Sequence, residues 1–285
     1  MRKDPLAREL PGWLSVGLIL GVVAVITWLE IKRPLRRQTQ DRLRRNSRNL
    51  MVATLSAAAI RYAEKPVTNT LARLVHRKNF GLVKWMRLPV WLEVITAGIL
   101  LDYTLYIWHV LTHKVDFLWR FHRVHHADLD LDWSTAVRFH FVEMVLSVPW
   151  RAAQIVLIGV SPLSLSVWQT ATLAAIVFHH SNLELPIAIE RRLCRVLMTP
   201  RMHGIHHSIV KAETDSNWST ILAFPDYLHG TFRLNVPQHE ITIGVPAYVT
   251  DEQNIIELMV MPLDPPRVEG PRRTPGRENL ACLAE

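Results

Sequence analysis

The sequence is poor in cysteine and glycine. It has 285 residues, of which only Cys194 and Cys282 are cysteines, and these two lie far apart. A disulfide-stapled scaffold is therefore excluded, and free thiols in a reducing compartment are favoured. With 11 glycines and no internal repeat, the chain is neither collagen-like nor of low complexity.

Acidic residues are outnumbered as well, because 33 Lys and Arg stand against 25 Asp and Glu and leave a net charge of +8. Hydrophobic residues make up 49% of the chain, a high share for a soluble protein of this charge, which disfavours a soluble nucleic-acid binder. Histidine is abundant, with 14 residues, most of them grouped between His109 and His207. The composition predicts a metal site in or beside a membrane and no nucleic-acid partner.

The first long apolar run, Gly12 to Leu29, has 18 uncharged residues and is long enough to cross a membrane. A cleavable signal peptide is the alternative, but no small-residue cleavage site precedes the arginines that follow. The next segment, Lys32 to Arg48, carries eight basic residues and one acid. By the positive-inside rule it is predicted to be cytoplasmic, as a topogenic cluster and not a nucleic-acid patch.

Later apolar runs predict further membrane helices, for about four spans in all. Residues 50–63 are expected to form a second span or a hairpin limb in the interface. Stronger signals are a span at Leu88 to Trp108 and a helical hairpin of Phe141 to Val160 and Leu163 to Phe178 around Ser161-Pro162. This hairpin would bring the histidines before and after it to one membrane face. Charge leaves the orientation open, since Arg61 to Arg87 is also basic.

The sequence after Phe178 becomes polar. A short helix is expected from Glu252 to Met261, with Thr250 and Gln253 as its capping box. The tail from Pro265 onward is rich in Pro, Arg, Gly and Glu, and it is expected to be disordered.

Four polar residues around the end of the Leu88 to Trp108 span fall on one helical stripe. Their spacing of i, i+4, i+7 and i+11 places them within about 60° of one another; they are Asp102, Tyr106, His109 and His113. A carboxylate in a span needs a partner, so Asp102 is predicted to accept a hydrogen bond from an imidazole that binds metal. A hydrogen bond that packs helices together is the alternative.

The pattern H-x-x-H-H occurs twice. The first copy, His122, His125 and His126, lies on a helix expected from Phe117 to Ala127 with Asp116 as its N-cap. Offsets of 0, 3 and 4 put these imidazoles on one helical face about 100° wide. A single histidine on a face is usually a packed core residue, but three at this spacing indicate a metal site.

The second copy is His203, His206 and His207, on a helix that Thr199 is expected to cap and Pro200 to begin. Gly204 inside this helix is expected to let another backbone approach closely. Together with the H-x-x-x-H pair the two copies give eight imidazoles, and His180 at the end of the hairpin is a ninth candidate.

Nine neutral imidazoles exceed what one metal ion uses, since zinc takes four ligands and octahedral ions take six. Two metal ions are therefore predicted. Imidazole binds Zn, Cu, Fe and Ni alike, so spacing leaves the metal open. A site that opens onto lipid meets C–H bonds, which iron with O2 can break and side-chain acids and bases cannot.

Three stretches resemble the fatty acid hydroxylase/sterol desaturase superfamily of membrane-bound non-haem di-iron oxygenases. They are DYTLYIWHVLTHKVDFLWRFHRVHHADLDLDWSTAVRFHFVE (Asp102 to Glu143), FHHSNLELP (Phe178 to Pro186) and TPRMHGIHHSIVKAETDSN (Thr199 to Asn217). The resemblance implies an all-α integral membrane helical bundle with a cytosolic His-rich helical cap that holds two Fe ions, with O2 as co-substrate. It also implies hydroxylation or desaturation of a lipid with electrons from a separate donor protein. We expect that donor to dock on basic residues such as Arg36, Arg37, Arg42 and Arg44.

The resemblance further implies a ligand set and a domain organisation. The implied metal ligands are His109, His113, His122, His125, His126, His180, His203, His206 and His207. The organisation is an N-terminal segment (1–11), N-terminal membrane helices and basic loops (12–87), a catalytic domain (88–263) and a tail (264–285). Val110 after the first histidine and Pro225-Asp226 near the third region depart from the family pattern, which leaves the subfamily open. Four more residues stay open between a role at the metals and ordinary packing: Asp102, His140, His179 and Asn217.

Three alternatives come from other classes of protein. A haem cytochrome would need single histidines within spans, and a zinc hydrolase would need an H-E-x-x-H motif. A metal transporter would need polar ligands at the bilayer midplane, where the candidates are Glu93, Asp102, Glu143 and Arg151. Histidines clustered in threes at the ends of spans favour the oxygenase.

Overall fold

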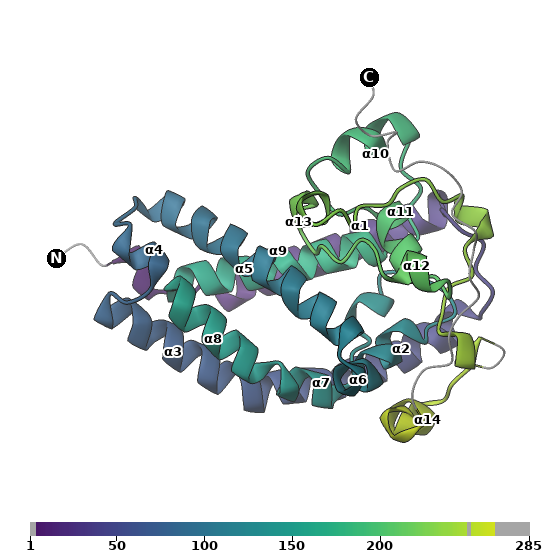
Figure 1. Cartoon of the computed structure of the whole chain (residues 1–285), viewed down its shortest axis with the longest axis horizontal. Helices are drawn as coiled ribbons and strands as arrows, with labels where there is room; N and C mark the ends of the chain where they lie inside the picture. The colour runs from purple at the N-terminus through teal and green to yellow at the C-terminus, as the bar shows by residue number, and fades with distance from the viewer. Residues whose placement is uncertain (1–3, 250–251, 266–285) are drawn as a thin grey trace.

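The computed structural model describes residues 4–249 and 252–265, which form helices and loops without a strand (Figure 1). The all-α expectation is confirmed. The longer helices are α1 (Gly12–Lys32), α2 (Arg42–Ala59), α3 (Lys65–Lys78), α5 (Val90–Lys114), α6 (Asp116–His126), α8 (Val148–Ile158) and α9 (Pro162–His180). The shorter ones are α4 (Leu82–Trp85), α7 (Phe141–Leu146), α10 (Ile187–Leu193), α11 (Pro200–His206), α12 (Lys211–Thr214), α13 (Phe224–Leu228) and α14 (Ile255–Val260). Five 3₁₀ turns lie at Pro5–Ala7, Thr135–Val137, Gln238–Glu240, Pro246–Tyr248 and Met261–Leu263.

The long helices form a bundle with a cap at one end (Figure 1). Helices α1 and α9 lie side by side in the same direction, because Leu10 N–H donates to Ser166 Oγ at one end and Leu35 N–H donates to the Asn182 carbonyl at the other. Helix α9 also packs on α5, and α3 packs on α8. We call the end of the bundle that carries α6 and α11 the cap end, and the opposite end the far end.

Residues 42–78 form one helical run from the cap end to the far end. It consists of α2, a five-residue π-helical segment (Ile60–Glu64) and α3, and at 1.5 Å per residue it is about 55 Å long. The expectation of a hairpin limb at residues 50–63 was therefore wrong, because the helix continues through this stretch. Its basic and amide side chains keep the run out of the set of apolar helices that could cross a membrane.

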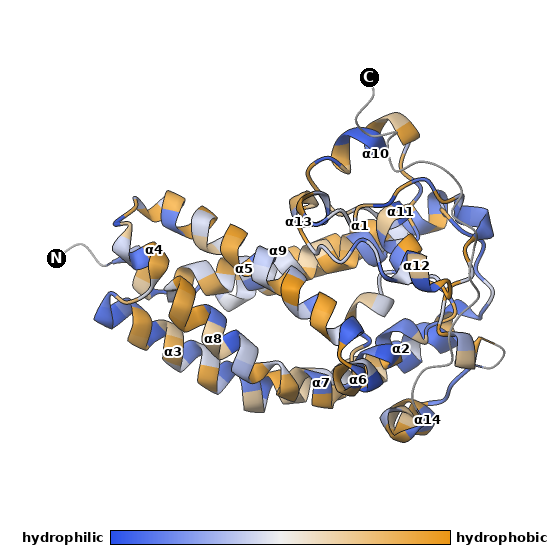
Figure 2. Cartoon of the chain, viewed as in Figure 1, coloured by the Kyte–Doolittle hydropathy of each residue, from blue (hydrophilic) through white to orange (hydrophobic). Residues whose placement is uncertain are grey.

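Three helical segments of the described chain are long and apolar enough to span a membrane: Gly12–Lys32, Val90–Lys114 and Phe141–Ile158. They confirm the expected spans near residues 12–29, 88–108 and 141–160. Helix α9, expected as a fourth, is not among them because its first half carries Ser164, Ser166, Gln169, Thr170 and Thr172. It lies inside the bundle between α1 and α5. Figure 2 shows the apolar residues concentrated on the bundle, with more hydrophilic residues on α2 and the cap.

The far end is closed by two glycines in contact. Helix α8 ends at Gly159 in the left-handed region, and Ser161 caps α9, so the predicted hairpin turn is confirmed. A Cβ atom added to Gly81 would lie 2.4 Å from the Gly159 Cα atom, and both glycines have positive φ. Only glycine at both positions allows this approach of the loop after α3 to the α8–α9 turn.

The C-terminal helix is shorter than predicted. Helix α14 begins at Ile255, and its capping box consists of Asn254 and Glu257. Thr250, the expected cap, lies outside the described residues, as does the tail beyond Pro265.

Candidate metal centre

Eight of the nine predicted histidines gather in two groups at the cap end. In each group the four potential ligand nitrogens lie within 4.8 Å of one another. The first group is His109, His113, His126 and His206, and the second group is His125, His180, His203 and His207. Residues from four helices, α5, α6, α9 and α11, are thereby brought to one place from across a hundred residues of sequence.

The two groups are adjacent because each H-x-x-H-H helix contributes to both. Neighbours in sequence point about 100° apart around a helix, so His125 joins the second group while His126 joins the first. His206 and His207 divide in the same way, and the rings of His126 and His207 stack at 4.2 Å between centroids. The repeated pattern therefore builds a paired site.

Nitrogen atoms within the second group approach one another closely. The Nε2 atom of His180 lies 3.0 Å from that of His125 and 2.9 Å from that of His203. His180 donates its Nδ1–H to the Ile176 carbonyl at 2.8 Å, so in the neutral ring its Nε2 carries a lone pair and no proton. Two ligands at 2.0–2.1 Å from one metal, at a right angle, are about 3 Å apart. The spacing fits a shared metal ion.

Backbone carbonyls orient the rings of the first group. His109 donates from Nδ1 to the Trp218 carbonyl and His206 from Nδ1 to the Ser216 carbonyl, both at 2.8 Å. Each bond leaves the Nε2 lone pair directed into the group. Nε2 of His206 is buried and has no hydrogen-bond partner among the described residues. Metal-ligating histidines are held in this way by a bond at the other ring nitrogen.

His122, the ninth predicted ligand, lies between the two groups and belongs to neither group of four. Its ring is 4.9 Å from that of His113 and 5.4 Å from that of His125. Its Nδ1 lies 2.9 Å from Glu143 Oε1 on α7, and its Nε2 is buried without a hydrogen-bond partner in the described chain. Its environment is that of a ligand oriented by a carboxylate.

Burial keeps the cap histidines neutral. It lowers the pKa of His126, His206 and His207 well below the ordinary value, and repulsion from neighbouring imidazoles lowers it further. Only the neutral ring can bind a metal ion. The donor set, neutral and converging, fits two ions of a metal that accepts nitrogen ligands.

Two buried carboxylates hold the loop that supplies these carbonyls. Asp226 accepts from the N–H groups of Trp218 and Ser219, each at 3.0 Å. Asp102 accepts from Ile221 N–H at 3.2 Å and Leu222 N–H at 3.0 Å. The predicted bond from Asp102 to an imidazole was therefore wrong. Asp102 precedes His109 by seven residues, about 10 Å along the helix axis, which is beyond hydrogen-bond reach.

The other open residues lie outside the two groups. His140 caps α7 by accepting from Val142 N–H at 3.2 Å. Asn217 has φ of 53°; its side-chain amide donates to the Met202 and Arg233 carbonyls and accepts from Arg233 N–H. His179 donates to the Thr220 carbonyl at 3.0 Å, and its ring is 4.2 Å from that of His203. His179 therefore lies against the second group.

The helices that carry the two motifs differ in detail from expectation. Helix α6 begins at Asp116 and not after it, with Val115 at the N-cap position. Thr199 occupies the N-cap position of α11 but makes no capping bond. At Gly204 the approaching group is a side chain and not a backbone: an added Cβ would lie 1.6 Å from Arg36 Nη2. Arg36 donates there to the Pro200 carbonyl at 2.9 Å.

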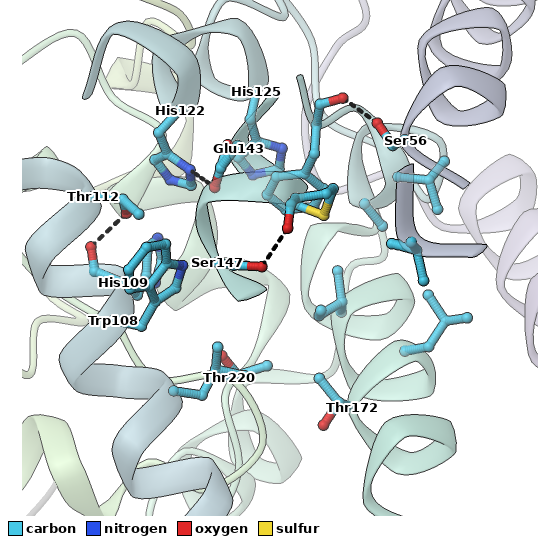
Figure 3. A pocket seen from close by; sticks show the side chains of 18 of the residues that line it. Ser56, Trp108, His109, Thr112, His122, His125, Glu143, Ser147, Thr172 and Thr220 are labelled. Atoms are coloured by element: carbon cyan, nitrogen blue, oxygen red, sulfur yellow. Dashed lines mark hydrogen bonds and ion pairs between the residues drawn. The ribbon is translucent and has the colours of Figure 1, made fainter. Parts of the chain in front are cut away.

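An apolar cavity of about 400 Å³ leads away from the histidines. Figure 3 shows His109, His122 and His125 along one side of it and Thr172 on the other. Its histidine lining comes from both groups, and its walls come from α2, α5, α7, α8 and α9. The apolar wall residues include Ala53, Ala57, Ile60, Leu105, Ala136, Met144, Leu173 and Ile176. A flexible hydrocarbon chain fits such a surface.

Several functional groups escaped sequence analysis. Glu143 was considered only as a ligand in a transporter; it lies 21 residues after His122, too far for local periodicity to pair the two. The carbonyls of Ser216 and Trp218 carry no side-chain signature at all. Asp226 was visible only as a departure from the family pattern, in Pro225-Asp226.

Residues 94–231 match the family model described as Fatty acid hydroxylase. An ornithine lipid hydroxylase of Rhizobium tropici is 30% identical over 243 residues, covering 82% of this chain and 71% of that protein. A cholesterol 25-hydroxylase-like protein of Danio rerio is 30% identical, covering 50% and 55%, and an alkylglycerol monooxygenase of Xenopus tropicalis is 29% identical, covering 49% and 29%. No solved structure matches the chain.

Proposed function

The chain belongs to the fatty acid hydroxylase family, and from this premise we propose that it is a membrane-bound lipid oxygenase with a paired non-haem iron centre. It hydroxylates or desaturates a lipid with O2 and two electrons. The observation that carries the proposal is the meeting of two four-histidine groups at one end of an apolar cavity. Relatives named as lipid hydroxylases and a monooxygenase support a lipid substrate.

In this proposal each histidine group holds one iron ion, with His122 between them. Bound iron would supply the O2-dependent oxidising power that side chains lack. The chain itself orients the ligands through the loop carbonyls and Glu143, and keeps the imidazoles neutral by burial. The walls of the cavity exclude water and align an alkyl chain so that one carbon lies beside the histidines.

The electron donor is proposed to be a separate protein that docks near the cap end. Of the four arginines first considered for this role, Arg36 and Arg42 are engaged inside the protein, with Pro200 and Glu30 respectively. Arg37 and Arg44 are exposed, so they are the better docking residues. Charge reversal of this pair should slow turnover at low salt and not at high salt. Unchanged turnover at low salt would remove them from the proposal.

We place the cap end on the cytoplasmic side, because Lys32 to Arg48 lies there and carries eight basic residues. A membrane-impermeant maleimide should then label a cysteine introduced at exposed Lys211 only after the membrane is opened. The same cysteine at exposed Lys78, at the far end, should be labelled in intact cells. The opposite pattern would place the cap outside.

The decisive experiment counts metals and products. Protein purified and reconstituted with Fe²⁺ should hold about two irons per chain, and the His206→Ala variant should hold fewer. Cells that produce the wild-type chain should contain a lipid that has gained one oxygen or lost two hydrogens, absent from cells with the variant. One haem, or a single zinc that iron cannot replace, would overturn the proposal.

A further inference from the structure

The end of the cavity away from the histidines is polar. Glu64, Arg151 and Thr172 all line it, and we call these three residues the polar floor. On α9, Thr172 precedes His180 by eight residues, and Arg151 follows Glu143, the partner of His122, by the same number. At 1.5 Å per residue the polar floor lies about 12 Å from the histidine groups.

These side chains have few partners for groups so deep in a helical bundle. Glu64 is 9% exposed, and its carboxylate makes no hydrogen bond or ion pair within 4.0 Å in the described part of the chain. The Thr172 hydroxyl is buried and has no partner there either. Arg151 donates to Gln154 Oε1 at 3.1 Å and lies 5.0 Å over the Trp168 ring. No acid neutralises it at contact distance among the described residues.

Another ionic pair in the same bundle shows what a complete partnership looks like. Lys84 and Glu93 are both buried and meet at 2.5 Å, away from the cavity lining. Ionisable groups within a membrane bundle are costly unless paired. A carboxylate and a guanidinium that face one cavity without meeting leave room for a group that hydrogen-bonds to both.

Resting on the proposed oxygenase function, we propose that the polar floor binds a lipid group that both donates and accepts hydrogen bonds, a hydroxyl or an amide. The group donates to the Glu64 carboxylate and accepts from the Arg151 guanidinium, with Thr172 as a further partner. Binding there fixes the lipid along the cavity. The carbon beside the histidines is then the one about 12 Å from the polar group, so the polar floor sets substrate choice and position of attack.

A purely structural role for Arg151 makes a different prediction. Through Gln154, which donates to Thr104 Oγ1 at 2.6 Å, Arg151 joins α8 to α5, and Trp168 joins it to α9. If joining these helices were the only role of Arg151, replacing Arg151 would lower the stability of the protein and leave its ligand preference unchanged. Binding preference therefore separates the two roles.

The test uses four C16 probes on metal-free protein in nanodiscs: hexadecanol, hexadecanamide, hexadecyl methyl ether and hexadecane. Binding is followed by tryptophan fluorescence, since Trp108 lines the cavity. The alcohol and the amide should bind about tenfold more tightly than the alkane, and the ether, which cannot donate, should gain little. The stronger of the first two identifies the group. An alkane that binds as tightly as both would overturn the proposal.

Variants complete the test. Glu64→Gln and Arg151→Met should each remove most of the preference for the polar probes and leave hexadecane binding unchanged. Thr172→Val, which replaces a hydroxyl with a methyl group and changes no charge, covers the case that a charge variant does not fold. Glu93→Gln is the matched control, expected to lower the melting temperature and keep the preference. Retained preference in all three floor variants would reject the proposal.

Product analysis of iron-loaded protein with a reductant separates this inference from the proposed function. The wild type should oxidise hexadecanol at one distance from the hydroxyl, and Glu64→Gln should scatter the position. Binding preference without any oxidation would refute the oxygenase and keep the polar floor. Oxidation at scattered positions in the wild type would support the oxygenase and refute the polar floor.

Discussion

Two buried polar regions lie next to each other at the cap end, and they are built on opposite principles. One is an ionic network in which unlike groups meet. Arg45 pairs with Asp132, Arg138 Nη1 lies 3.2 Å from Asp128 Oδ1, and Asn49 bridges Asp128 and Arg138 at 2.9 and 3.1 Å. The other region is the two histidine groups, in which like meets like. In the network each charge meets an opposite charge, whereas the imidazole nitrogens that face into the histidine groups meet other imidazoles.

This difference separates scaffold from site. Buried charges are tolerated when opposite charges and hydrogen bonds surround them. Burial alone would raise the pKa of the Asp128 carboxyl, but the guanidinium groups of Arg45 and Arg138 hold it below its usual range. The converging lone pairs of the two histidine groups have no opposite charge within their groups, and a shared cation would satisfy them. The network also holds the histidines in place, since Arg138 Nε–H donates to the Val124 carbonyl in α6 at 3.0 Å.

Removing one histidine from a group should have the largest effect, on both bound iron and turnover. The His203→Ala variant removes one ligand of the second group, and iron in the purified, reconstituted protein should fall well below two per chain. Turnover should fall by more than about a hundredfold, beyond the cost of losing a group that merely orients a ligand. His239→Ala is the control, because that side chain is 83% exposed. Two irons retained in His203→Ala would take that histidine out of the ligand set.

Acid should destabilise the metal-free protein through the same histidines. Because burial lowers the pKa of His125, His126, His203, His206 and His207 below the ordinary value of 6.5, the unfolded chain binds more protons than the folded chain below that pH. Stability must then decrease as the pH falls below about 6.5, by about 1 kcal/mol for each histidine between pH 7 and 5.5. Bound iron also keeps the folded rings free of protons, so the loaded protein should lose at least as much stability over this pH range, starting from a higher melting temperature. A loaded protein that melts at the temperature of the metal-free protein would contradict metal binding by these rings.

Breaking the network should unfold the protein without touching a ligand. Arg45→Met leaves Asp128 and Asp132 with an uncompensated buried charge, and the expected cost is about 3–5 kcal/mol. Lys211→Ala, which removes an exposed ion pair with Asp215, should cost less than about 1 kcal/mol. Thermal unfolding in detergent measures both. The Arg45→Met protein that still folds should bind iron normally, and iron loss at full stability would refute the division into scaffold and site.

The sequence alone predicted the two histidine groups better than it predicted the ionic network. Three imidazoles at offsets of 0, 3 and 4 share a face whatever lies around the helix, so His122, His125 and His126 could be placed from local periodicity. The apolar runs of α1 and α5 are local signals of the same kind. Each is decided by helix geometry within a few turns.

What could not be predicted depends on distant pairing. Arg45 meets Asp132 across 87 positions, and nothing in either neighbourhood names the other. Carbonyl groups such as that of Trp218 have no side-chain signature. Asp102 shares a stripe with His109 and His113, which suggested a bond to an imidazole of the site, but a stripe fixes the angle around the helix and not the distance along its axis. The helical faces that carry the histidines could be predicted from the sequence, whereas the distant residues and carbonyls that hold those faces in place could not.

Weakening the carboxylate that orients His122 should have a moderate effect. Glu143→Gln keeps a hydrogen-bond acceptor for His122 and removes the negative charge that strengthens the imidazole as a donor to metal. Iron affinity should fall by about 10–100-fold, measured by competition with a chelator. Glu190→Gln, which alters a buried carboxylate paired with Arg201 outside the histidine groups, should leave iron affinity unchanged. An effect of equal size in both variants would mean that Glu143 acts only through stability.

The smallest effect concerns the support of α11. Arg36 donates to a backbone carbonyl of this helix, as Arg138 does to one of α6. In the wild type, Gly204→Ala places a methyl group 1.6 Å from Arg36 Nη2, and the guanidinium must leave its bonds to Pro200 and Gln238. The cost should be at least about 1.5–3 kcal/mol, the size of one charged hydrogen bond. In an Arg36→Ala background the same substitution should instead stabilise by about 0.5–1 kcal/mol, because alanine is the better helix former and the three atoms nearest the added methyl group, all from Arg36, are gone. A double-mutant cycle by thermal unfolding tests this change of sign, and a destabilising Gly204→Ala in both backgrounds would show that something other than Arg36 requires the glycine.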